Sequence, residues 1–153
     1  VFTFSMHGER NYPTRKMRSR LDVGLADGVG DDEYLGLLAR HLSEILRNFT
    51  PDIVFYRAGV DPARGDRYGR LALSDDGIRR RDRHVLEACL GRRLPVVITL
   101  AGGYAATPER TAELHSIVFS EAATLLRTAH REMIADIDIP KINGRDPLRP
   151  SSE

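Results

Sequence analysis

The chain has 153 residues, a length that fits one domain better than two. It is 41% hydrophobic and 29% charged, which excludes a disordered or fibrous protein, and no apolar run is long enough to span a bilayer. The 23 basic and 22 acidic residues leave a net charge of +1, so nothing indicates a nucleic-acid or membrane partner. The single cysteine, Cys89, excludes a disulfide framework and predicts a reducing, cytoplasmic location.

Clusters of β-branched and aromatic residues predict four strands. These strands are expected at residues 1–5, 21–25, 53–56 and 95–100. The last two are continuous apolar runs, which are typical of parallel strands that are buried on both faces. The polar stretch 6–20 shows no periodicity and is predicted to be a loop.

Three further segments have the apolar periodicity of helices: residues 31–49, residues 74–91 and residues 107 to about 133. Their ends carry residue types that favour helix termini: Asp31 or Asp32 as cap of the first, Ser74 and Gly91 at the ends of the second, and Thr107 with Pro108 at the start of the third.

The second predicted helix carries the densest group of charges in the chain: Arg79, Arg80, Arg81 and Arg83 beside Asp75, Asp76 and Asp82. We interpret this group as a solvated helix face rather than a phosphate or partner site, because mixed charges are common on exposed helices. Cys89 falls on the apolar face of the same helix and is predicted to lie in the core. The five histidines show no metal-binding spacing, and the four on predicted helices, His41, His84, His115 and His130, are predicted to be surface or hydrogen-bonded residues.

Alternation of strands and helices predicts an α/β fold in which helices cover the faces of a mainly parallel sheet. In such sheets, ligands bind at the carboxyl ends of the strands. Three segments with unusual residues are expected at that edge: residues 5–12, 59–69 and 101–105.

Two of these segments carry groups that could do chemistry. Asp61 and Asp66 follow a strand and are flanked by glycines, so they could face a ligand or a metal; on spacing alone, two turn-forming aspartates are the favoured explanation. Asp66 could also accept hydrogen bonds from nearby backbone amides. In Gly102-Gly103-Tyr104, the glycines allow close approach and the tyrosine could donate to an oxyanion, but a tight turn with a packed tyrosine is the simpler alternative.

Taken together, the ordered motifs resemble the C-terminal half of a histone deacetylase catalytic domain, of the class IV and bacterial branch, from Val1 to about Leu126. The motifs that carry this resemblance are Phe4-Ser5-Met6-His7, Asn11-Tyr12-Pro13, Gly30-Asp31-Asp32-Glu33-Tyr34, Ala58-Gly59-Val60-Asp61 with Gly65-Asp66-Arg67, Gly69-Arg70-Leu71 and Gly102-Gly103-Tyr104.

The resemblance implies a zinc-dependent amide hydrolase with the three-layer arginase/deacetylase fold, acting on an acetylated lysine peptide or a small acetylated amine. It also implies residue roles: Asp61 as a zinc ligand, Tyr104 as the hydrogen-bond donor to the substrate carbonyl, Tyr12, Gly102 and Gly103 beside the substrate tunnel, and Ser5 with the Met6 carbonyl as ligands of a structural potassium ion.

This chain departs from the family pattern, because the tandem histidines and the Asp-x-His zinc ligands lie upstream of these motifs in the family. We therefore expect residues 1–138 to be the C-terminal portion of a catalytic domain whose N-terminal part is missing, followed by a loose or docked tail at 139–153. The missing half is the expected partner, and the 153 residues alone are predicted to bind zinc weakly and to be inactive. The alternatives are a truncated, non-catalytic binding module and an acetylpolyamine-type amidohydrolase.

Overall fold

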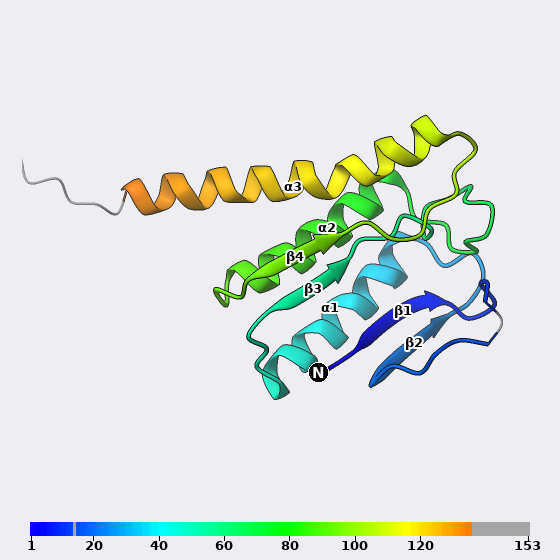
Figure 1. The fold of residues 1–153 in the computed structure, drawn as a ribbon, viewed down its shortest axis with the longest axis horizontal. Helices are drawn as coiled ribbons and strands as arrows, with labels where there is room; N and C mark the ends of the chain where they lie inside the picture. The colour runs from blue at the N-terminus through cyan, green and yellow to red at the C-terminus, as the bar shows by residue number, and fades with distance from the viewer. Residues whose placement is uncertain (14, 136–153) are drawn as a thin grey trace, which may run out of the picture.

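The computed structural model describes residues 1–13 and 15–135 (Figure 1). In chain order the elements are β1 (Phe4–Gly8), β2 (Leu21–Leu25), α1 (Asp31–Asn48), β3 (Val54–Arg57), α2 (Asp75–Leu90), β4 (Val96–Thr99) and α3 (Pro108–Ala135). The tail predicted at 139–153 lies outside the described residues. Of the helices that the structure describes, none is both long and apolar enough to cross a membrane.

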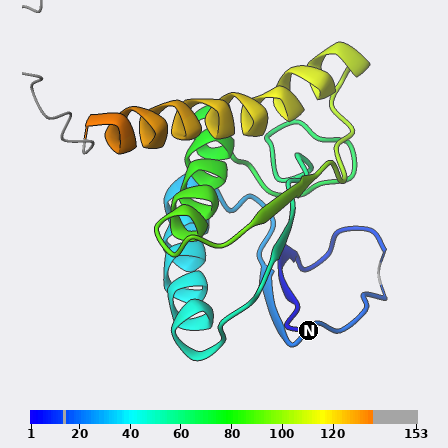
Figure 2. The ribbon, with the colours of Figure 1, turned by 60° about the vertical axis from the view of Figure 1, so that its left-hand side comes forward.

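All strand pairing is parallel, which confirms the predicted α/β class. Strand β1 pairs with β2 and β3 with β4, so these described strands form two sheets of two strands each. In Figure 2, α1 and α2 lie on the same side of β3 and β4, while α3 crosses the end of α2. Helix α2 packs against both α1 and α3 and is therefore the central element of the helical layer.

The core lies between the strands and these helices. One cluster joins Tyr34 and Leu38 of α1 to Ile78 of α2 and to Leu73 of the preceding loop. A second cluster joins Ala58, Leu86 and Val118 from the end of β3, α2 and α3. Cys89 is 1% exposed, so its predicted place in the core is confirmed.

The expectation that β3 and β4 are buried on both faces is wrong for the described residues. Tyr56 and Ile98 pack against the second cluster, whereas Phe55 is 66% exposed and Val97 is 37% exposed. Side chains alternate across a strand, and the described residues cover only the helical side.

Strand β1 begins and ends three residues later than predicted, so the loop expected from Met6 begins only after Gly8. The cause is tertiary, because β1 pairs residue by residue with β2, from Phe4 opposite Leu21 to Gly8 opposite Leu25. The polar sequence of this strand gives no local periodicity from which its end could be predicted.

The start of α1 also differs from the prediction that Asp31 or Asp32 caps it. Gly30 is the N-cap and makes no side-chain cap hydrogen bond. Asp31 instead accepts hydrogen bonds from the backbone N–H of Ser74 at 2.8 Å and from the Ser74 hydroxyl at 2.5 Å. Since the Ser74 hydroxyl accepts from Gly77 N–H at the start of α2, Asp31 ties the N-termini of α1 and α2 together.

The interpretation of the arginine cluster as a solvated face is wrong at Arg81 and Asp82, which are 4% and 1% exposed. Arg79 and Arg83 are half-exposed but both form ion pairs with the buried Glu121 of α3, at 3.4 Å and 2.7 Å. The cluster therefore serves the packing of α2, which the alternation of charges did not reveal.

We expect Asp31→Ala to lower the free energy of unfolding by about 2 kcal/mol, because it leaves two donors of Ser74 without their charged acceptor. Asp32→Ala is the matched control, because it removes the same charge from the same helix turn. The Asp32 side chain is 99% exposed, and its ion pair with Arg80 is long, at 3.9 Å. This substitution should cost less than about 0.5 kcal/mol. Urea unfolding measures both, and equal losses would contradict the structural role of Asp31.

Candidate functional site

The loops that follow β3 and β4 lie side by side. We call residues 58–74 the Asp61 loop and residues 100–107 the Tyr104 loop. The pairing of the two strands continues into the loops, because the Gly102 carbonyl accepts hydrogen bonds from Val60 N–H at 2.6 Å and from Asp61 N–H at 3.3 Å. The expected meeting of these segments at the carboxyl ends of the strands is thus observed.

The Asp61 carboxylate occupies space that two glycines leave open. A Cβ atom added to Gly59 would lie 2.8 Å from Asp61 Oδ1, and one added to Gly102 would lie 2.9 Å from the same oxygen. Real Cβ atoms do not approach an oxygen so closely, so larger residues at either position would displace the carboxylate. The glycines therefore determine where Asp61 can point.

Asp61 is partly buried, and burial raises the pKa of its carboxyl above the ordinary value. Its own backbone N–H opposes this shift, Asp66 adds to it, and Arg81 also opposes it. No other residue in the described ranges donates a hydrogen bond to the Asp61 side chain. A desolvated carboxylate with few partners is suited to binding a cation, because a cation compensates the charge that burial disfavours.

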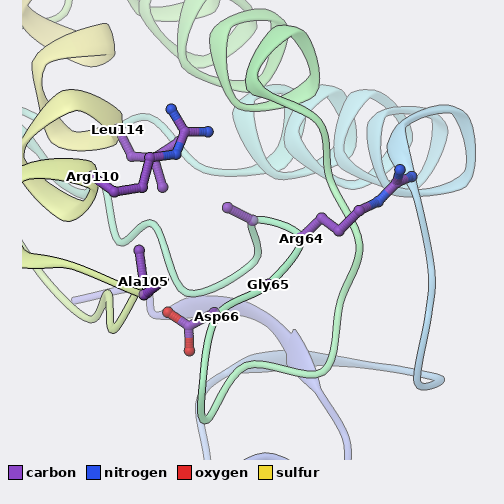
Figure 3. A pocket seen from close by; sticks show the side chains of 8 residues that line it. Arg64, Gly65, Asp66, Ala105, Arg110 and Leu114 are labelled. Atoms are coloured by element: carbon purple, nitrogen blue, oxygen red, sulfur yellow. The ribbon is translucent and has the colours of Figure 1, made fainter.

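Asp66 joins the Asp61 loop to the Tyr104 loop. Its Oδ1 accepts from the backbone N–H groups of Tyr68 and Gly69, at 2.9 Å and 2.6 Å. Its Oδ2 accepts from the backbone N–H of Tyr104 at 2.5 Å. Figure 3 shows the Asp66 carboxylate beside Ala105. The proposed capping of nearby amides is confirmed, and the contact with Tyr104 is an addition that the sequence did not indicate.

A small cavity of about 190 Å³ lies next to this junction, lined by residues of both loops and of α3. In Figure 3, the Arg64 side chain extends away from Arg110, Ala105 and the other lining residues. Arg110 forms ion pairs with Asp75 and Glu113. The cavity therefore offers no converging set of polar groups.

The aromatic residues of the site are exposed. The Tyr104 side chain is 55% exposed, and its ring meets the Tyr68 ring edge-to-face, with centroids 4.9 Å apart. Tyr12, 84% exposed, lines an open groove of about 510 Å³ together with Tyr68 and Arg70. No hydrogen bond to the Tyr104 hydroxyl comes from the described residues.

Ser5 and Met6 lie inside β1 rather than beyond its end. The Ser5 hydroxyl is 2.8 Å from His7 Nδ1. At the two ends of the ladder, Leu21 N–H donates to the Thr3 carbonyl and Glu9 N–H donates to the Leu25 carbonyl. Bonds in a parallel ladder alternate by residue, so the Met6 carbonyl points away from β2.

A buried polar network lies behind the Asp61 loop. Arg81 of α2 donates to the Gly59 carbonyl at 2.6 Å and to Asp82 Oδ1 at 2.9 Å, and Tyr56 donates to the same Asp82 oxygen at 2.5 Å. Burial raises the pKa of Tyr56, which keeps it a protonated donor. The signal missed in the sequence was the helical position of Arg81, three residues after the buried Ile78.

The His115 ring, on α3, lies against the backbone of the Tyr104 loop at Gly103. A Cβ atom added to Gly103 would lie 3.2 Å from His115 Nε2, so the ring is close to the loop backbone. Its Nδ1 is buried without a hydrogen-bond partner among the described residues. Burial lowers the pKa of His115, and the positive charge of Arg81 acts in the same direction. His115 is thus partly exposed, as expected for a surface histidine, and departs from the expectation only at its buried Nδ1.

Within residues 1–13 and 15–135, no group of three or more His, Cys, Asp or Glu side chains is placed to hold a metal ion. Among the described residues Asp61 is thus a single partly buried carboxylate without further candidate ligands grouped around it. Catalytic zinc sites in proteins use three protein ligands.

Comparison with known sequences and structures agrees with the geometry. The sequence model of the histone deacetylase domain matches residues 1–121. An uncharacterised protein of Picosynechococcus sp. is 48% identical over 87% of this chain and 42% of its own length. Histone deacetylase 2 of Arabidopsis thaliana is 36% identical over 68% of this chain and 28% of its own length.

Among solved structures, acetylpolyamine aminohydrolase from Burkholderia pseudomallei superposes with a TM-score of 0.63 at 25% identity, covering 79% of this chain and 37% of that one. The chain therefore spans less than half the length of these proteins. The family match over residues 1–121, together with the parallel strands and the paired loops at their carboxyl ends, shows that the chain belongs to the histone deacetylase family.

Proposed function

We propose that these residues form part of the catalytic site of a zinc-dependent deacetylase, an amide hydrolase that removes an acetyl or other acyl group from a lysine side chain or a small amine. The observation that carries this proposal is the junction of the Asp61 and Tyr104 loops, which places a desolvated carboxylate and an exposed phenol at one edge of the sheet. The family membership of residues 1–121 supports the same reaction class.

In this proposal Asp61 is one ligand of the zinc ion, and the glycines at 59 and 102 direct its carboxylate. Bound zinc would polarise the amide carbonyl and lower the pKa of a water molecule. Tyr104 donates its hydroxyl hydrogen to the oxygen of the substrate carbonyl as negative charge develops there. Tyr12 and the backbone at Gly102 and Gly103 line the approach of the acyl group.

The substrate is proposed to be an acetylated lysine or a smaller acetylated amine. The structural similarity to an acetylpolyamine aminohydrolase supports a small acetylated amine as the alternative substrate. Turnover of an acetyl-lysine peptide and of an acetylpolyamine by the same preparation distinguishes the two.

We expect Asp61→Ala to abolish deacetylation by the complete gene product, because a lost ligand weakens the metal site, and Tyr104→Phe to lower kcat by about a hundredfold or more, because it removes one oxyanion donor. Tyr68→Phe is the matched control, since it removes a hydroxyl from the neighbouring ring. Chelation should stop the reaction and zinc should restore it. Full activity of both Asp61→Ala and Tyr104→Phe would overturn the proposal.

The 153-residue chain by itself should bind zinc weakly and show no turnover, because Asp61 is its one proposed zinc ligand. The matched measurement compares this chain with the product of the complete reading frame on the same acetyl-lysine peptide. Zinc-dependent turnover by the 153 residues that is lost in Asp61→Ala would contradict this expectation.

Gly102→Ala should weaken zinc binding by the complete gene product about tenfold or more, because the new methyl group would lie 2.9 Å from Asp61 Oδ1 and turn the carboxylate. Gly36→Ala is the control, since its added Cβ meets nothing within 4 Å. Competition with a chromophoric chelator measures both affinities. An unchanged affinity in Gly102→Ala would show that the carboxylate does not depend on this glycine.

A further inference from the structure

The Tyr104 side chain has few contacts that could determine its position. Its side chain is 55% exposed, its hydroxyl receives no hydrogen bond from the described residues, and its aromatic contact is an edge-to-face one with Tyr68, which is itself 59% exposed. A phenol that acts on a substrate must nevertheless be held within a fraction of an ångström of its working position. The position of the ring must therefore come from the backbone that carries it.

The backbone of Tyr104 is held on both sides by two consecutive residues of the Asp61 loop. Its N–H donates to Asp66 Oδ2 at 2.5 Å, and its carbonyl accepts from Arg67 N–H at 3.0 Å. The Arg67 side chain adds a hydrogen bond to the Ala106 carbonyl at 2.9 Å. Two of these three bonds are charge-assisted and made by side chains, and of these two the bond to Asp66 is the one that holds Tyr104 itself.

Asp66 divides its two oxygens between two tasks. Oδ1 serves its own loop through the amides of Tyr68 and Gly69, which is the ordinary behaviour of an aspartate in a turn. Oδ2 serves the other loop. In Figure 3 the carboxylate faces the chain at Ala105, on the side away from Arg64. A residue needed only for its own turn would use one acceptor and leave the second to solvent.

We propose that Asp66 is a positioning residue for Tyr104: its Oδ2 fixes the backbone of the Tyr104 loop and so places the phenol for reaction. This inference rests on the proposed function, since it is the working position of Tyr104 that Asp66 secures. Asp66 itself does not touch the substrate in this scheme. It acts through the peptide group of Tyr104.

The substitution Asp66→Asn separates the two tasks. Asparagine keeps one acceptor oxygen for the turn, where it is as well suited as aspartate, so the loop should fold. Its amide nitrogen would then face the N–H of Tyr104, and two donors cannot bond each other. Asp27→Asn is the matched control, because it also removes a carboxylate charge, and among the described residues the Asp27 side chain contacts the exposed Arg10 and Arg70 rather than the Tyr104 loop.

We expect Asp66→Asn to lower the kcat of the complete gene product on an acetyl-lysine peptide about ten- to a hundredfold, with KM unchanged within about twofold. In a Tyr104→Phe background the same change should have no further effect on kcat, because its effect passes through the missing hydroxyl. A purely structural loss would lower activity equally in both backgrounds. Either that additive result, or a kcat for Asp66→Asn equal to that of Asp27→Asn, would overturn the proposal.

Hydrogen exchange at the Tyr104 amide tests the positioning without any turnover. Exchange should speed up about tenfold or more in Asp66→Asn and stay unchanged in Asp27→Asn, because only the first loses the acceptor of that N–H. If the wild-type protein hydrolyses no acetylated substrate but this pattern appears, the proposed function fails and the positioning by Asp66 stands. If the exchange rates of the two variants are equal, the positioning by Asp66 is wrong whatever the activity.

Discussion

The arrangement of the site depends on one buried positive charge, the guanidinium group of Arg81. The Arg81 side chain is 5% exposed, and it is bonded to the Gly59 carbonyl and to Asp82, whose side chain is 1% exposed. A buried charge is tolerated only while its partners remain in place, so separating α2 from the end of β3 would leave a guanidinium and a carboxylate without compensation. The backbone two residues before Asp61 is therefore fixed from behind by a helix, and the loop that follows is built on that fixed point.

From this point the geometry is passed on by backbone hydrogen bonds. The parallel pairing of β3 and β4 continues through Gly102, whose carbonyl receives the N–H groups of Val60 and Asp61. Beyond it, Asp66 connects back to Tyr104. The Asp61 loop and the Tyr104 loop are thus linked twice, once through Gly102 and once through Asp66. Glycines at positions 59 and 102 leave room for the Asp61 carboxylate between the loops.

Much of the fold and of the candidate site could be predicted from the sequence. The features that could not be predicted have one physical cause in common. Apolar runs and end signals predicted α2 at Ser74 and Gly91, and the motifs brought Asp61 and Tyr104 to one edge of the sheet. Local patterns failed where a side chain acts across the fold. Arginine is a residue type typical of exposed helix faces, but Arg81 is buried and donates to the Gly59 carbonyl, 22 positions away in sequence. The link from Asp66 to Tyr104 spans 38 positions, and no local spacing encodes it.

The resulting site combines a fixed backbone with exposed reactive groups. Stabilisation of a developing oxyanion requires a donor that is already in place, because reorganisation during the reaction would consume the energy that the hydrogen bond provides. Here the fixed part is the peptide of Tyr104, held at its N–H and its carbonyl, while none of the described residues forms a hydrogen bond with the phenol hydroxyl. The same logic applies to Asp61, whose carboxylate is directed by its surroundings but makes few hydrogen bonds. Both groups are therefore oriented while making few contacts among the described residues, which is the condition that the proposed function sets for a metal ligand and an oxyanion donor.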